Sequence, residues 1–164
     1  MISAYLVVKF IHVLCSTLLL GTGLGAAIFL FASYRTRRAD FLRSTAYHVV
    51  IVDWIVVAPT VIVQLVTGIW LASYLNVPFN SVWFVSVLGL FFVTGACWLP
   101  IAWIQFQLSH LAVGNEESME SPSHLRDRKL IRIWIACNVL TFSLLFVLFW
   151  LMVFKQGMAT PWFE

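Results

Sequence analysis

A long central stretch of this sequence lacks formal charge: between Trp54 and Asn115 there is no Asp, Glu, Lys or Arg. Such a stretch is long enough to cross a ~30 Å hydrocarbon core twice as α-helix. Over the whole chain only 10% of the residues are charged and 62% are hydrophobic, whereas about a quarter of the residues in a soluble domain are charged. The sequence therefore predicts an integral membrane protein.

Apolar segments of spanning length predict an all-α, polytopic bundle of four transmembrane helices that forms a single domain. These helices are expected at about residues 2–34, 45–75, 81–112 and 129–155. A basic loop (Arg35–Arg43), a tight polar turn (Asn76–Asn80) and a charged loop (Gly114–Lys129) separate them. The first segment is expected to be retained as a helix, because its arginines follow the apolar run, whereas the basic residues of a signal peptide precede it.

The distribution of basic residues predicts the orientation. Most of the ten Lys and Arg residues lie in or beside the first and third loops, while Lys9 and Lys155 lie near the termini. By the positive-inside rule, both termini face the outer side of a bacterial inner membrane. The net charge of +3 is thus a topology signal, and no nucleic-acid partner is expected. Aromatic residues expected at the two membrane interfaces include Tyr5, Tyr74, Trp83, Trp162, Tyr47 and Trp134.

Every predicted helix carries its polar residues on one face. Because lipid offers polar side chains no partner, such faces usually turn toward the interior of a bundle. Helix by helix, the stripes are Lys9, His12, Ser16 and Gly23; Asp53, Thr60, Gln64 and Thr67; Thr94, Trp98 and Gln105; and Trp134, Asn138 and Thr141.

Depth along the helices divides these stripes into two layers. Asp53, Gln105 and Asn138 lie roughly seven to nine residues from the predicted cytoplasmic boundary, and we expect them to form one hydrogen-bonded cluster. This buried polar cluster either fixes the helices against one another or serves as a proton relay or ligand site, since a charged Asp53 at that depth is costly unless it is paired or protonated. His12 and Gln64, about ten residues from the outer boundary, are expected to form a second cluster.

The cysteines fall near the middle of apolar helices. The plain interpretation is that Cys15, Cys97 and Cys137 are small core residues. The alternative is a Cu(I) site built from soft thiolates, with Met152 or Met158 near the outer side. Because the cysteines are odd in number and expected to be buried, no disulfide framework is predicted.

The remaining histidines are expected outside the interior. His48 and His110 lie at the cytoplasmic ends of their helices and off the polar stripes, and His124 lies in the charged loop. His12 is therefore the interior histidine. Near it, Gly21 and Gly25 form a GxxxG arrangement that allows close approach of a neighbouring helix or of a second copy in a homodimer, the alternative partner being a larger membrane complex.

Several motifs in order resemble one family along nearly the whole chain. These are "YLVVKFIHVL" with "GTGLGAA", "VIVDWIVVAP" with "TGIWLA", "GACWLPIAWIQ", and "IRIWIA" with "FWLMVFK". They resemble the family of predicted integral membrane proteins known as domain of unknown function 2269. That resemblance implies membrane location and no established activity.

The opening motif has a second resemblance, over Tyr5–Gly25. An aromatic residue followed by Lys, two apolar residues and His is similar to the first helix of the membrane protoporphyrinogen oxidases that bind haem b, and more loosely to the copper-resistance D proteins. It implies His12 as an axial haem ligand and Lys9 as a partner of a haem propionate. The sequence departs from a bis-histidine pattern, because no second interior histidine lies at the depth of His12.

Three functional hypotheses follow. The first is a b-type haem-binding bundle in electron transfer or porphyrin-related oxidation, with His12 as the iron ligand and Lys9, Ser16 and Gln64 around it. The second is a non-enzymatic accessory or scaffold subunit without cofactor, in which Lys9 reaches the headgroups and His12 bonds Gln64 or Ser16. The third is a copper-handling protein. The sequence contains no Walker A, Cys-x-x-Cys, HExxH or nucleophile-elbow motif, so enzymatic activity stays open.

Overall fold

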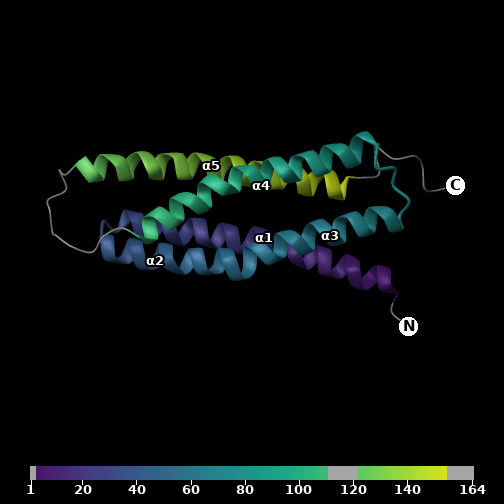
Figure 1. Ribbon diagram of the computed structural model, residues 1–164, viewed down its shortest axis with the longest axis horizontal. Helices are drawn as coiled ribbons and strands as arrows, with labels where there is room; N and C mark the ends of the chain where they lie inside the picture. The colour runs from purple at the N-terminus through teal and green to yellow at the C-terminus, as the bar shows by residue number, and fades with distance from the viewer. Residues whose placement is uncertain (1–2, 111–121, 155–164) are drawn as a thin grey trace.

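The computed structural model describes residues 3–110 and 122–154, without the side chains of residues 39 and 122–128 (Figure 1). In these ranges the chain is helical and contains no strand. The elements are α1 (Ala4–Arg35), α2 (Ala39–Val52), the π-helical turn η1 (Asp53–Val57), α3 (Ala58–Tyr74), α4 (Val82–Ser109) and α5 (Pro122–Val153).

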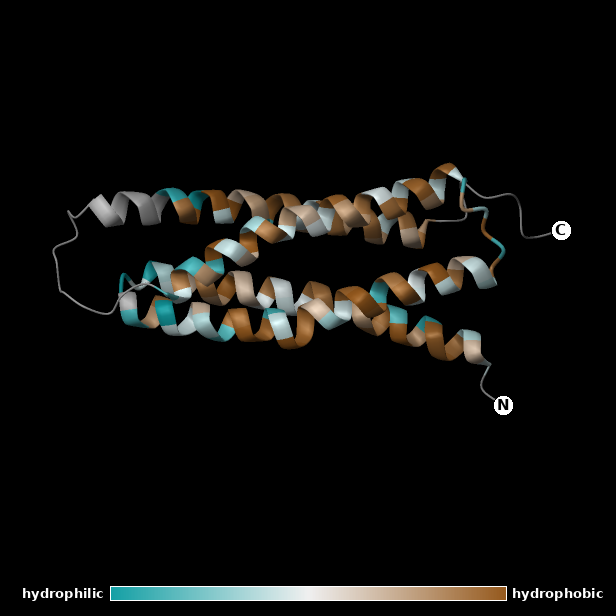
Figure 2. Ribbon diagram, in the orientation of Figure 1, coloured by the Kyte–Doolittle hydropathy of each residue, from teal (hydrophilic) through white to brown (hydrophobic). Residues whose placement is uncertain are grey.

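The described part of the chain contains four helices that are long and apolar enough to cross a membrane. They are α1, the continuous run of α2, η1 and α3, then α4, and α5 from Lys129 onward. The predicted all-α polytopic bundle is therefore confirmed. Figure 2 shows hydrophobic residues along the length of all these helices, with hydrophilic residues gathered where α1 and α2 meet.

Two helices begin earlier than their apolar runs. α2 starts at Ala39 and α5 at Pro122, whereas the hydropathy pattern predicts starts near residues 45 and 129. The added turns hold polar and charged residues, which a helix carries without difficulty once it leaves the hydrocarbon core. The predicted ends of the third and fourth helices, at residues 112 and 155, lie outside the described residues.

The helices form two antiparallel pairs that meet at one end of the molecule. α1 packs on α3 and α4 packs on α5, and the two pairs are joined chiefly by α2 against α4. We call the end that holds the α1–α2 turn at Thr36–Arg38 the basic end (Figure 1). The end that holds the start of α1 and the α3–α4 turn is the N-terminal end.

The hydrophobic core has a different extent at the two ends. At the basic end, one cluster takes side chains from all the spanning helices: Leu30, Leu42, Ala46, Ile101, Ile104, Leu108, Ile131 and Trp134. At the N-terminal end a smaller cluster of Trp83, Val87 and Leu148 joins only α4 and α5. All four spanning helices therefore share one core at the basic end, whereas only α4 and α5 share a core at the N-terminal end.

Two of the aromatic residues expected at the interfaces face inward. Trp134 is 2% exposed and lies in the core of the basic end. Trp83 is buried against α5, where its Nε1 donates a hydrogen bond of 2.9 Å to the Leu151 carbonyl. Trp134 thus lies on the inward face that its polar stripe predicted, and the interface depth expected for both tryptophans stays a prediction. Trp162 lies outside the described residues.

Proline accounts for the π-helical turn. Pro59 lacks an N–H, and its ring would clash with the carbonyl oxygen four residues before it in a regular helix. The turn before it is widened, and the Ala58 N–H donates to the Asp53 carbonyl five residues back. Asp53, Thr60 and Thr67 all lie buried along the resulting helix. Widened turns of this kind frequently occur at functional sites.

Candidate functional site

A cluster of polar side chains joins α1 to α3. The imidazole Nδ1 of His12 lies 2.9 Å from Thr67 Oγ1, and its Nε2 lies 3.1 Å from Gln64 Nε2. Gln64 Nε2 also donates to Ser16 Oγ at 2.7 Å. We call His12, Ser16, Gln64 and Thr67 the α1–α3 cluster. The structure therefore brings together His12, Ser16 and Gln64 with Thr67, which the sequence placed on the same polar stripe as Gln64.

The proton positions in this cluster follow from its hydrogen bonds. Ser16 Oγ donates to the His12 carbonyl at 2.9 Å and Thr67 Oγ1 donates to the Val63 carbonyl at 2.6 Å. Each hydroxyl uses its only hydrogen in that bond, so it acts as an acceptor in its second hydrogen bond. Thr67 consequently accepts from His12 Nδ1–H, and His12 Nε2 accepts from the Gln64 amide. His12 is thus neutral, with its proton on Nδ1.

Gly68 lets α3 approach the imidazole ring. A Cβ atom at this position would lie 3.1 Å from His12 Cε1, tighter than ordinary van der Waals contact. Any larger residue would push the ring away from Thr67. Gly68 was not among the residues singled out in the sequence, although its position four residues after Gln64 puts it on the same helix face.

The geometry around His12 does not fit an axial haem ligand. Ligation needs an imidazole lone pair that faces a space large enough for a porphyrin, whereas Nδ1 carries a proton bonded to Thr67 and Nε2 faces Gln64. Lys9 is exposed on α1, with its Nζ 5.7 Å from the centre of the Tyr5 ring.

The other described histidines bond to their own helices at the basic end. His48 Nδ1 lies 2.7 Å from the Ser44 carbonyl, and His110 Nδ1 lies 2.9 Å from the Phe106 carbonyl. Neither reaches the α1–α3 cluster near the opposite end. A second histidine at the depth of His12 is thus not present among the described side chains.

The described residues contain no group of three or more His, Cys, Asp or Glu side chains that could hold a metal ion. Cys15 is buried in α1, while Cys97 in α4 and Cys137 in α5 are partly exposed. Met152 is exposed on α5, and Met158 lies outside the described residues.

Asp53, Gln105 and Asn138 do not form the expected hydrogen-bonded cluster. No hydrogen bond joins these three side chains, and Asn138 Nδ2 instead donates to the Trp134 carbonyl in its own helix at 2.8 Å. Asp53 is 6% and Gln105 is 3% exposed, yet Asp53 Oδ2 and Gln105 Oε1 have no partner among the described residues. Both are acceptors, which water or another donor would satisfy.

Helix boundaries explain the separation. The 14 residues of α2 precede Asp53, so it lies near the middle of its span. Gln105 is close to the end of α4 at Ser109, within the packed core of the basic end.

The fold and its polar interior define an integral membrane protein with four spanning helices in its described part. The chain belongs to the family described as "Predicted integral membrane protein (DUF2269)", whose model matches residues 6–156. This match confirms the family resemblance seen in the sequence motifs. No curated protein and no solved structure matches the chain.

Proposed function

We propose that this chain is a non-enzymatic scaffold subunit of the bacterial inner membrane that assembles with a second copy of itself. The observation that carries this proposal is the set of hydrogen bonds in the α1–α3 cluster, in which Gln64 Oε1 is the buried polar atom without a partner among the described residues. Each N–H and O–H donor assigned in it has an acceptor within the protein, which suits a clamp between two helices better than a site that awaits a ligand.

The strength of the clamp is estimated from its contacts. Bonds from His12 to Thr67, from Gln64 to His12 and from Gln64 to Ser16 cross between the helices. Interhelical hydrogen bonds in membranes contribute on average ~0.6 kcal/mol each, so together they stabilise the pair by roughly 2 kcal/mol. That is a substantial stabilisation for the N-terminal end, where the four-helix core is absent.

A groove between α1 and α2 supports self-association. It has a volume of about 470 Å³, and small residues of α1, Thr22, Gly25 and Ala26, form one of its walls. A Cβ atom at Gly21 or Gly25 would meet nothing within 4 Å. Glycines with open space in front of them are typical of surfaces where another membrane helix packs closely, and a two-fold dimer is the commonest assembly of identical chains.

The basic end supports an orientation with both termini outside. Arg35, Arg37 and Arg38 are exposed at the α1–α2 turn, where the positive-inside rule predicts cytoplasm. The N-terminus and the α3–α4 turn lie at the other end (Figure 1).

Energy transfer between labelled copies in lipid vesicles tests the dimer. Gly25→Leu fills the groove, and since overpacking costs about 1–3 kcal/mol, we expect the dimer to weaken roughly tenfold. Gly89→Leu is the control, because Gly89, like Gly25, has nothing within 4 Å of its Cβ position but lies exposed on α4. Equal effects of the two variants, or no transfer in the unmodified protein, would contradict the proposal.

Haem b at His12 is the competing function, and a visible spectrum tests it directly. Haem binding requires His12 to break its hydrogen bond to Gln64 or to Thr67, so that one imidazole nitrogen can bind iron. The scaffold proposal therefore expects no Soret band from protein that is purified in mild detergent and supplied with haem. A Soret band that shifts on reduction with dithionite and is lost in His12→Ala would overturn the scaffold proposal in favour of haem. Bound copper that is lost in a Cys97→Ser variant would instead favour the copper-handling alternative.

A further inference from the structure

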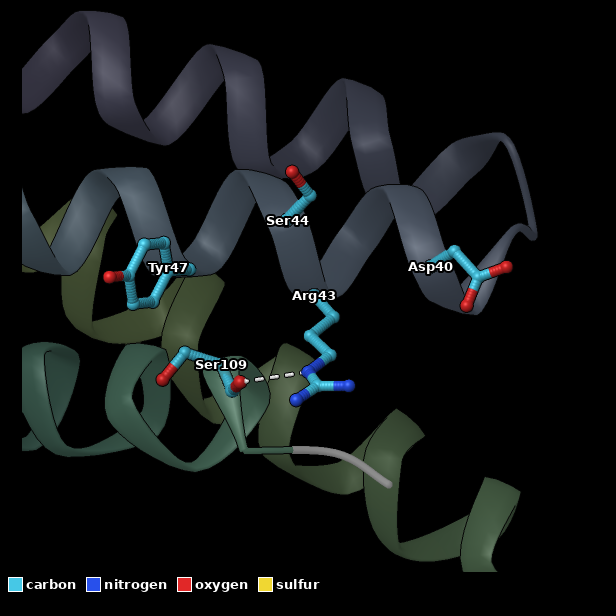
Figure 3. A pocket seen from close by; sticks show the side chains of 5 residues that line it. All are labelled: Asp40, Arg43, Ser44, Tyr47 and Ser109. Carbon is cyan, nitrogen blue, oxygen red and sulfur yellow. Dashed lines mark hydrogen bonds between the residues drawn. The ribbon is translucent and has the colours of Figure 1, made fainter. Parts of the chain in front are cut away.

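A polar pocket lies between α2 and α4 at the basic end. It has a volume of about 300 Å³ and is lined by Asp40, Arg43, Ser44, Tyr47 and Ser109 (Figure 3). Four of these residues lie on α2 at the spacing of one helix face, and Ser109 closes the pocket from the end of α4.

Arg43 is held in place from α4. Its Nε donates a hydrogen bond of 3.3 Å to the Ser109 carbonyl, and Figure 3 shows the two terminal nitrogens directed away from that bond. The terminal nitrogens keep four N–H donors. A guanidinium fixed in this way presents the planar fork that binds phosphate oxygens in pairs.

Asp40 puts a negative charge in the same pocket. It precedes Arg43 by three residues, a spacing at which opposite charges on a helix can meet. No ion pair within 4.0 Å joins the two among the described residues, and Figure 3 shows their charged groups apart. The pocket therefore offers a separated cation and anion, which complement a ligand that itself carries a phosphate and an ammonium group.

The surroundings indicate that this ligand is a lipid. Toward the middle of the span, the pocket is followed by Tyr47 and Ile51 on α2 and by Trp54 in η1, all of which are exposed. On α4, Phe106 and Trp103 are exposed on the turns that precede Ser109. A polar pocket that continues into exposed apolar side chains matches a lipid headgroup followed by acyl chains. A soluble phosphate would make no contact with the apolar side chains.

We propose that the pocket formed by Asp40, Arg43, Ser44, Tyr47 and Ser109 binds the headgroup of phosphatidylethanolamine. The phosphate accepts hydrogen bonds from the Arg43 guanidinium, and the ammonium group pairs with the Asp40 carboxylate. An anionic headgroup such as phosphatidylglycerol gains the first contact but lacks the second. This lipid site is independent of the scaffold function proposed above.

Lipid binding to the delipidated, detergent-solubilised protein, measured by native mass spectrometry, tests this site. Phosphatidylethanolamine and phosphatidylglycerol with the same acyl chains are compared. Because a hydrogen bond to a charged group is lost, Arg43→Gln is expected to weaken binding of both lipids roughly tenfold. Asp40→Asn is expected to remove the preference for phosphatidylethanolamine. Arg35→Gln, an exposed arginine at the end of α1, is the control and leaves both affinities unchanged.

Several outcomes would overturn the site. These are equal affinity of the unmodified protein for the two lipids, a preference for phosphatidylglycerol, or an Arg43→Gln variant that binds like Arg35→Gln. Displacement of the lipid by an equal concentration of phosphoethanolamine or inorganic phosphate would assign the pocket to a soluble ligand instead. Arg43→Lys keeps the charge without the planar fork, so an intermediate loss in this variant, with an unchanged melting temperature, separates headgroup binding from a folding defect.

Discussion

Removal of the Thr67 hydroxyl isolates one bond of the α1–α3 cluster. Thr67→Val keeps the shape of the side chain but deletes the acceptor of His12 Nδ1–H, which is 2.9 Å away. Thr67 also donates to the carbonyl of its own helix, at Val63. The control is Thr17→Val on α1, because the Thr17 hydroxyl donates to Val13 in the same way, at 3.0 Å, and has no partner on another helix.

The difference between the two variants gives the interhelical contribution. Such bonds average ~0.6 kcal/mol and reach ~1.7 kcal/mol in membrane proteins. The His12–Thr67 bond has favourable length, and its loss leaves a partly buried imidazole N–H without an acceptor. We therefore expect Thr67→Val to lower the free energy of unfolding by about 1 kcal/mol more than Thr17→Val, roughly fivefold in the unfolding equilibrium.

Reversible unfolding in mixed lipid–detergent micelles, titrated with sodium dodecyl sulfate, measures this difference. Both variants are compared with the unmodified protein at one pH and one protein concentration. If the two valine variants lose equal stability, the bond between His12 and Thr67 does not hold α1 against α3, and the assignment of the proton to Nδ1 loses its support.

Three further outcomes are expected. Nitrogen NMR of labelled histidine should show neutral His12 with its proton on Nδ1, shifting toward Nε2 in Thr67→Val; a doubly protonated ring at neutral pH would contradict the assignment. Gly68→Val should lower the free energy of unfolding by about 1–3 kcal/mol through overpacking, whereas Gly21→Val, with open space around it, should leave the monomer unchanged. Asp53→Asn should unfold at the same or a higher denaturant concentration, because it replaces a buried ionisable carboxyl group, one oxygen of which has no partner, by a neutral amide; a marked loss of stability would reveal a partner for the carboxylate.

The contacts of His12 were partly accessible from the sequence, whereas its chemistry was not. Helical periodicity put His12, Ser16 and Gln64 on facing stripes at similar depth, and they meet in the structure. The sequence left open whether His12 binds iron or only hydrogen-bonds. That question depends on Thr67 and on the close approach at Gly68, neither of which a single helix specifies.

The cluster expected from Asp53, Gln105 and Asn138 shows where depth counting fails. Hydropathy locates the part of a helix inside lipid, but α2 continues outward through polar turns to Ala39. A count from the end of a helix gives the depth of a residue, but not which side chain of another helix it meets. The residues share an interior location, yet no hydrogen bond joins them.

By itself the sequence determined that the chain crosses the membrane as four helices, because burial of apolar surface acts locally along the chain. Helical period also placed His12, Ser16 and Gln64 on facing stripes. The tertiary structure alone decided the pairing of α1 with α3, the proton position on His12 and the pocket where Arg43 meets Ser109. Those two residues are 66 positions apart. Contacts of this kind depend on how side chains of different helices pack against one another, and no local pattern in the sequence records that packing.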